Sequence, residues 1–72
     1  MLELLKEAKT KSFSTEYYVK LHFDNETGHY SVYANSNKFN WGHSATFETK
    51  QEAEVDFYHT LDKYDFYKWE VK

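Results

Sequence analysis

The chain of 72 residues contains no cysteine, no proline and no arginine, and it has only two glycines. Without cysteine, neither a disulfide framework nor thiolate chemistry is available. Without arginine, the chain cannot make the bidentate guanidinium contacts by which many proteins hold phosphate or guanine. Two glycines are too few for a glycine-rich phosphate-binding loop. These absences exclude several classes of enzyme and nucleotide-binding protein.

Long apolar runs and a strong net charge are also missing. No segment approaches the roughly 20 apolar residues that cross a bilayer, and nothing at the N-terminus resembles a signal peptide. The net charge of −3 has the wrong sign for a basic nucleic-acid footprint and is too small for an acidic tail. We therefore expect one soluble, cytoplasmic domain over residues 1–72, with a thin core that buries roughly 60% of the unfolded surface.

The clearest local pattern begins at Thr49, which stands three residues before Glu52. This is the spacing of a capping box, in which the two side chains satisfy free amides at the start of a helix. No glycine or proline interrupts the segment that follows, so the sequence predicts a helix over residues 50–63. One face of that helix carries an apolar stripe: Ala53, Phe57, Leu61 and Tyr64. Val55 projects away from the stripe, roughly 200° from Ala53.

The remaining elements follow from two kinds of spacing. Alternation of apolar and polar residues predicts four strands: Glu16–Phe23, His29–Asn35, Phe39–Phe47 and Phe66–Val71. The segment Leu2–Lys11 has Leu2, Leu5 and Ala8 at helical spacing, which predicts a first helix. The expected fold is therefore an α+β two-layer sandwich of order α-β-β-β-α-β. An antiparallel meander of three strands and a C-terminal fourth strand carry both helices on one face. That face would present Tyr17, Val19, Leu21, Val32 and Phe47.

Candidate metal-binding and catalytic residues are few. His22 and His29 flank the first turn of the sheet but lack an evident third ligand. Glu52, Asp56 and His59 share one helical face at chelating spacing, which is also the pattern of a solvated acidic face. No serine or threonine stands in a nucleophile-elbow context. We therefore expect no enzymatic activity, no cofactor and no metal.

Aromatic residues make up 21% of the chain, with seven tyrosines, more than a thin core can hide. The face of the sheet away from the helices would carry a mixed set: Tyr18, Lys20, His22, His29, Tyr33, Phe66 and Lys68. Tyrosines interleaved with lysines on a sheet can stack nucleic-acid bases. They can equally pack against one another across strands as a structural feature.

The chain resembles small phage-encoded anti-CRISPR proteins that block Cas9. The resemblance rests on the run L-L-K-E-A-K-T-K at 4–11, the alternating strand at 17–21, a polar turn, a second strand and a late helix. It implies a stoichiometric inhibitor that binds a bacterial defence protein.

Two nucleic-acid-binding families also resemble parts of the chain. The element order over residues 2–64 is similar to the double-stranded RNA-binding domain. Glu52 and Glu54 stand where that family uses lysines to bind phosphate. The run N-W-G-H at 40–43 is similar to the WGR domain of DNA-repair proteins, whose arginine is His43 here.

The sequence thus predicts a small non-enzymatic protein-binding module, a phage or mobile-element inhibitor of a bacterial protein. The partner class considered first is a protein that normally holds nucleic acid. The preferred contact surface is the helix flank, with Val55 and Tyr58 as apolar anchors. Acidic residues around them would attract a basic protein to this surface: Glu52, Asp56 and Asp62. The other candidate surface is the outer sheet face with Tyr18 and Tyr33. The alternative function is direct nucleic-acid binding by the tyrosines and lysines of that sheet face.

Overall fold

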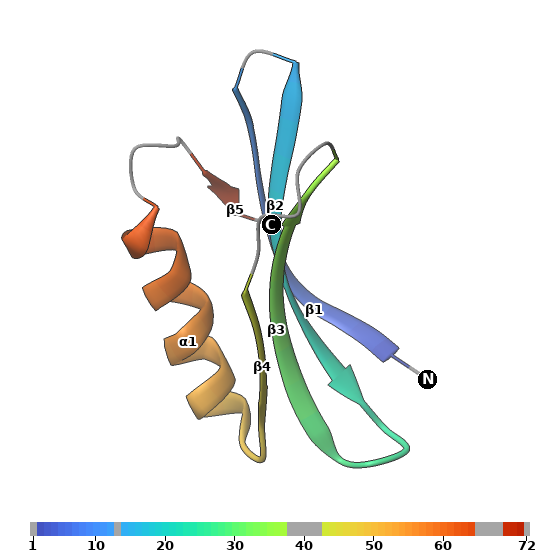
Figure 1. Cartoon of the computed structure of the whole chain (residues 1–72). Helices are drawn as coiled ribbons and strands as arrows, with labels where there is room; N and C mark the ends of the chain where they lie inside the picture. The colour runs from blue at the N-terminus through green and yellow to red at the C-terminus, as the bar shows by residue number, and fades with distance from the viewer. Residues whose placement is uncertain (1, 13, 38–42, 65–68, 72) are drawn as a thin grey trace.

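A five-stranded antiparallel sheet with one helix packed on it forms the structure, a computed structural model that describes residues 2–12, 14–37, 43–64 and 69–71 (Figure 1). In chain order the elements are β1 (Leu2–Ser12), β2 (Thr15–Asp24), β3 (His29–Ser36), β4 (His43–Phe47), α1 (Lys50–Lys63) and β5 (Glu70–Val71). The strands lie side by side in the order β4-β3-β2-β1-β5. The expected α+β class is confirmed. The expected two helices and four strands are wrong, because the described residues form one helix and five strands.

The N-terminal segment is the main correction, because Leu2–Ser12 is a strand and not a helix. It pairs antiparallel with β2 from Leu2 opposite Asp24 to Ser12 opposite Thr15, with one irregularity between Leu4 and Lys6. Leucine, glutamate and lysine favour helices only slightly, and a ten-residue helix is marginal by itself. A continuous ladder with a strongly alternating neighbouring strand therefore overrides the local preference.

The middle of the sheet follows the predicted alternation. Leu21 of β2 lies opposite Val32 of β3, which in turn lies opposite Ala45 of β4. The turn between β2 and β3 closes with a 2.8 Å hydrogen bond from the Gly28 amide to the Asp24 carbonyl, and Gly28 has a φ of 76° that suits glycine. The predicted strands Glu16–Phe23 and His29–Asn35 are thus present.

Two predicted strands are shorter in the described residues. Of the third, the structure describes His43–Phe47, and the predicted start at Phe39 falls in residues 38–42, which lie outside the described part of the chain. The last is limited to Glu70–Val71 and pairs with β1 at the edge of the sheet. Phe66 and Lys68, assigned to the outer sheet face from the sequence, also lie outside the described residues.

Helix α1 begins at the predicted cap. The Thr49 hydroxyl accepts a hydrogen bond from the Glu52 amide at 3.2 Å and donates one to the Glu52 carboxylate at 2.8 Å. At the other end, the Trp69 indole N–H donates to the Tyr64 carbonyl at 3.2 Å, which satisfies a carbonyl just beyond the last turn. No helix among the described residues is both long enough and apolar enough to cross a membrane.

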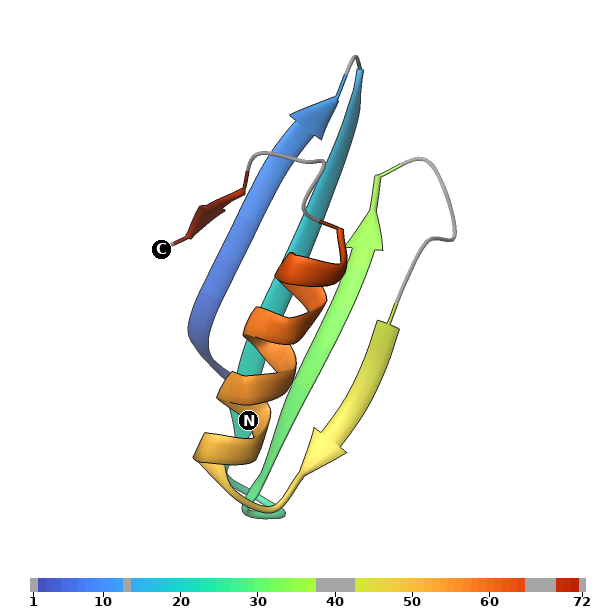
Figure 2. The same cartoon turned by 90° about the vertical axis from the view of Figure 1, so that its left-hand side faces the viewer.

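The core lies between α1 and one face of the sheet. Figure 2 looks onto the helix, which lies lengthwise over the sheet and contacts β2, β3 and β4. The buried apolar residues are Ala8, Val19, Leu21, Val32, Ala34, Ala53, Phe57 and Leu61, with Leu5, Tyr30, Phe47 and Trp69 packed at their margin. Ala53, Phe57 and Leu61 of the predicted helix stripe therefore meet the predicted inner residues Val19, Leu21 and Val32 as expected. Tyr64, the fourth residue of that stripe, is the half-buried C-cap and lies outside the core cluster. One face of the sheet packs against α1, and no described helix or strand packs on the opposite face.

Candidate binding surface

The uncovered face of the sheet lies on the side away from α1 and takes no part in packing the helix. Figure 1 shows α1 on one side of the sheet and no described helix or strand on the other. Strand pairing places outward side chains in rows across the sheet. One row joins Glu7, Lys20, Tyr33 and Ser44, and the next joins Lys9, Tyr18 and Asn35. The sequence therefore places aromatic and charged residues next to one another on an open surface.

Three rings form a cluster at the centre of this face. The His22 imidazole is stacked on the Tyr33 ring, with centroids 5.3 Å apart and planes inclined by 5°. The ring centroids of Tyr18 and Tyr33 lie 6.5 Å apart and the ring planes are inclined by 87°, so the edge of one tyrosine meets the face of the other. The Lys20 ammonium lies 4.9 Å from the Tyr18 centroid, within cation–π range. These contacts fix the rings before any partner arrives.

Glu7 offsets one of the two positive charges that Lys9 and Lys20 bring to the ring cluster. Its two carboxylate oxygens lie 3.4 Å from the Lys9 ammonium and 3.6 Å from the Lys20 ammonium. The Glu7 side chain is only 14% exposed, so water screens these pairs less than it would at an open surface. The centre of the face is consequently aromatic, and Lys9, Lys20 and Glu7 together leave it a single net positive charge.

The surroundings of His22 favour its neutral form. Its Nδ1 atom is buried and has no hydrogen-bond partner among the described residues. Burial lowers the pKa of His22 from its usual value, the nearby charge of Lys20 lowers it further, and the carboxylate of Glu7 opposes both. A neutral ring stacks on Tyr33 without bringing a second positive charge beside Lys20.

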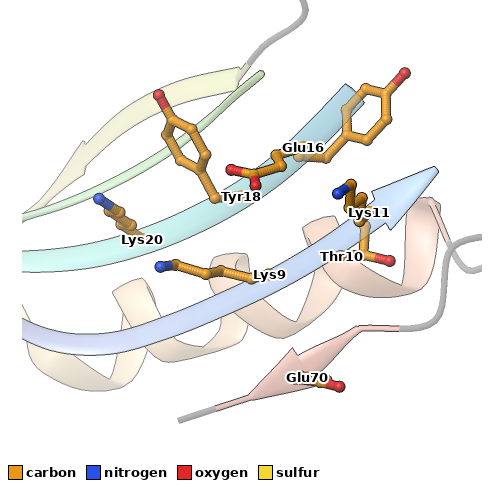
Figure 3. Close-up of a pocket in the computed structure, with 8 residues that line it drawn as sticks. Lys9, Thr10, Lys11, Glu16, Tyr18, Lys20 and Glu70 are labelled. Atoms are coloured by element: carbon orange, nitrogen blue, oxygen red, sulfur yellow. The ribbon is translucent and has the colours of Figure 1, made fainter. Parts of the chain in front are cut away.

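A hollow of about 590 Å³ adjoins the ring cluster (Figure 3). Strands β1, β2 and β5 line it with Lys9, Thr10, Lys11, Glu16, Tyr17, Tyr18, Lys20 and Glu70. Three lysines and two glutamates share this space, and Glu7 already pairs two of the lysines. The hollow is therefore large enough for a side chain or small ligand, but it has little surplus positive charge.

The predicted helix flank lies on the other side of the molecule. Val55 is 65% exposed and Tyr58 is 46% exposed, and the Lys6 ammonium lies 5.6 Å from the Tyr58 centroid. At 100° per residue, Asp62 lies beside Val55, whereas Asp56 projects roughly 160° from Tyr58 on the opposite flank. Glu52 and Asp62 are exposed, and Asp56 is half-buried. Helix geometry thus gathers Val55, Tyr58, Asp62 and Glu52 but not Asp56.

The two predicted surfaces face opposite directions. Tyr18 and Tyr33 lie on the uncovered face of the sheet, with α1 packed on the other face. A flat partner surface cannot contact both at once. Experiments can therefore separate the two by mutation.

The histidine and carboxylate sets considered for metal binding are not assembled into a site. His22 lies opposite Ser31 and His29 lies opposite Asp24, in different rows of the sheet. Among the residues that the structure describes, no group of three or more histidine, cysteine, aspartate or glutamate side chains could hold a metal ion.

Sequence reasoning missed several residues of the uncovered face because it assigned residues 2–11 to a helix. Glu7, Lys9 and Lys11 alternate with the smaller side chains Ala8 and Thr10, and all belong to β1. That period of two is the signal typical of a strand, and it would have placed these three charged residues beside Tyr18 and Lys20.

No protein family, curated protein or solved structure matches this chain. What the protein does is therefore inferred from its own residues.

Proposed function

We propose that this chain is a small non-enzymatic binding module that contacts a partner protein through the uncovered face of its sheet. The observation that carries the proposal is the ring cluster of Tyr18, Tyr33 and His22 on a surface that the fold does not need to cover. Tyrosine provides a large contact area at a low cost in conformational entropy. Rings already held by one another lose even less freedom on binding.

Charge on this face supports a protein partner over a nucleic acid. Phosphate binding depends on lysines that are free to replace counterions. Here Glu7 lies within 3.6 Å of both Lys9 and Lys20, and Glu16 and Glu70 line the adjoining hollow. A protein surface with apolar side chains and charges of both signs fits such a face better than a polyanion does.

The partner class to test first is a basic bacterial protein that normally holds nucleic acid, such as a defence nuclease. The chain carries a net charge of −3, so long-range attraction favours a basic partner. The resemblance to anti-CRISPR proteins suggests the same class. In that role the chain would be a stoichiometric inhibitor encoded by a phage or mobile element.

A differential pull-down from bacterial lysate tests the proposal. The bait proteins are the wild type, a sheet variant with Tyr18→Ala and Tyr33→Ala, and a helix variant with Val55→Ser and Tyr58→Ala. A ring-preserving control carries Tyr18→Phe and Tyr33→Phe. Circular dichroism first confirms that each bait is folded. A partner recovered by the wild type and the helix variant, but lost by the sheet variant, supports the proposal.

The affinity for that partner then decides between the faces. We expect the sheet variant to lose more than about 2 kcal/mol of binding free energy and the phenylalanine control to lose much less. If the helix variant loses affinity and the sheet variant binds like the wild type, the contact surface is the flank around Val55. If neither the sheet variant nor the helix variant loses affinity, neither surface contacts the partner.

Nucleic-acid binding through the same face is a second candidate, favoured by one specific observation. Lys20 lies 4.9 Å from the Tyr18 centroid beside a hollow that also contains Lys9 and Lys11, an arrangement that could stack a base next to a phosphate. Gel shifts with single- and double-stranded DNA and RNA at increasing salt test it. Tight binding that weakens steeply with salt, and that the sheet variant loses, would replace the protein-partner proposal.

A further inference from the structure

The outer edge of β1 is only partly paired. Strand β5 pairs with β1 at two positions, Ala8 opposite Val71 and Lys9 opposite Glu70. Among the described residues, no strand lies beside the outer edge of residues 2–7, as Figure 2 shows for the part of β1 below β5. An open edge presents unpaired backbone N–H and C=O groups and can accept another strand.

Apolar side chains stand at this open edge. Leu2 is 59% exposed and Leu4 is 48% exposed, and both are among the most exposed large apolar residues of the described chain. Both lie on the uncovered face of the sheet, because their partners in β2 are Asp24 and His22. A strand added at this edge would cover the two leucines as well as the backbone.

The irregularity in β1 changes which charges share a face. Glu3 lies opposite Phe23 and Lys6 lies opposite Leu21, so both belong to the face that carries α1. In a regular strand, residues three apart point to opposite faces. The extra residue between Leu4 and Lys6 removes that alternation, so an acid and a base occupy the same face of the same open edge.

From this arrangement we propose that the open edge of β1 pairs with the same edge of a second copy of the chain. The two strands run antiparallel about a twofold axis between Leu4 and Leu5. Glu3 of each copy then lies opposite Lys6 of the other, and Leu2 lies opposite Glu7. Leu4 and Leu5, which belong to opposite faces, meet at the axis, where both strands carry the irregularity. The two sheets join into one continuous sheet, and the contact is self-complementary, as a twofold dimer requires.

Neighbouring registers are less favourable. A twofold axis through Glu3 would set Glu3 opposite Glu3 of the other copy, and like charges in that position are destabilising. An axis through Leu4 would set Leu2 opposite Lys6, although these residues lie on opposite faces. Charge and face together favour this register over those two, and the self-complementary charges of Glu3 and Lys6 make a second copy the occupant. This proposal does not depend on the proposed function, because a dimer can form with or without a partner on the ring cluster.

Charge reversal tests the proposal by its symmetry. Sedimentation velocity over about a hundredfold range of concentration should show that the wild type dimerises. Because the edge is short, the dimer should be weak and dissociate on dilution. Glu3→Lys alone places lysine opposite lysine, and Lys6→Glu alone places glutamate opposite glutamate. Each should weaken self-association about tenfold or more.

The decisive measurement mixes the two single variants. A Glu3→Lys chain and a Lys6→Glu chain face each other with opposite charges at both positions, so the mixture should form a heterodimer although neither variant dimerises alone. The double variant should also recover self-association. Glu48→Lys is the matched control, since it makes the same charge change at an exposed residue beyond β4.

The same data can overturn the proposal. A wild type that stays monomeric at every concentration removes it. Dimerisation that the charge reversals leave unchanged, or a mixture of variants that stays monomeric, also removes it. Circular dichroism of each variant separates lost association from lost folding, which matters for Lys6 because its ammonium lies over the Tyr58 ring.

Discussion

The imidazole of His22 lies almost parallel to the phenol ring of Tyr33, with centroids 5.3 Å apart and planes inclined by 5°. The two residues come from adjacent strands, but they are diagonal neighbours, because His22 lies opposite Ser31 and Tyr33 lies opposite Lys20. Nδ1 of His22 is buried without a hydrogen-bond partner among the described residues. The energetics of the ring contact therefore depend on the protonation of His22.

Stability should decrease below pH 6.5 because of His22. Its pKa in the folded protein is lowered, chiefly by burial, from the usual value of 6.5. The unfolded chain therefore binds this proton more readily than the folded chain. The stabilising contribution is complete above pH 6.5 and is lost as the pH falls toward the lowered pKa. Urea denaturation above and below pH 6.5 measures the effect. His22→Phe, which keeps a ring on Tyr33, should reduce the pH dependence, and equal slopes for the two proteins would refute this.

Replacing Glu7 should change the titration of His22. The Glu7 carboxylate raises the pKa of His22 against the effects of burial and Lys20. In Glu7→Gln that support disappears, so the pKa of His22 should fall further. Nuclear magnetic resonance of the imidazole signals during a pH titration measures it. Glu16→Gln is the control, because it removes a carboxylate from the same face that has no part in the pKa of His22. A pKa that stays constant or rises in Glu7→Gln contradicts the assignment.

Phe57→Ala should destabilise the protein by about 3–5 kcal/mol, because the ring is fully buried against the sheet and its removal leaves a cavity. Chemical denaturation gives the value. Tyr58→Ala is the neighbouring control and should cost clearly less, since Tyr58 is 46% exposed. A cost below about 1 kcal/mol for Phe57→Ala is incompatible with its place in the core.

Thr49→Ala should cost about 1 kcal/mol through loss of the helix cap. The substitution removes the acceptor of the 3.2 Å bond from the Glu52 amide and the donor of the 2.8 Å bond to the Glu52 carboxylate. Thr49→Ser keeps both groups and should retain most of the stability. Thermal unfolding of the three proteins side by side provides the comparison. The role of the cap is refuted if serine and alanine prove equally destabilising.

The candidate surface was only partly predictable from the sequence. Alternation in β2 and β3 placed Tyr18, Lys20, His22 and Tyr33 on one face, and the structure agrees. Two of the charged residues that set the net charge of that face, Glu7 and Lys9, come from β1. Glu7 pairs with Lys9 and also with Lys20 of β2. Local spacing did not reveal those pairs, because they depend on which strand lies beside β2.

The amino-acid sequence by itself predicted the cap at Thr49, the helix that follows and the strands β2 and β3. Each depends on hydrogen bonds or apolar periodicity within a few residues of chain. Residues 2–12 were decided by tertiary structure. Leu2, Leu5 and Ala8 fit a helical stripe as well as a strand, and leucine, glutamate and lysine favour a helix by only a few tenths of a kcal/mol each. The ladder to β2 and the burial of Ala8 against Val19 outweigh that preference, and neither exists until the chain has folded.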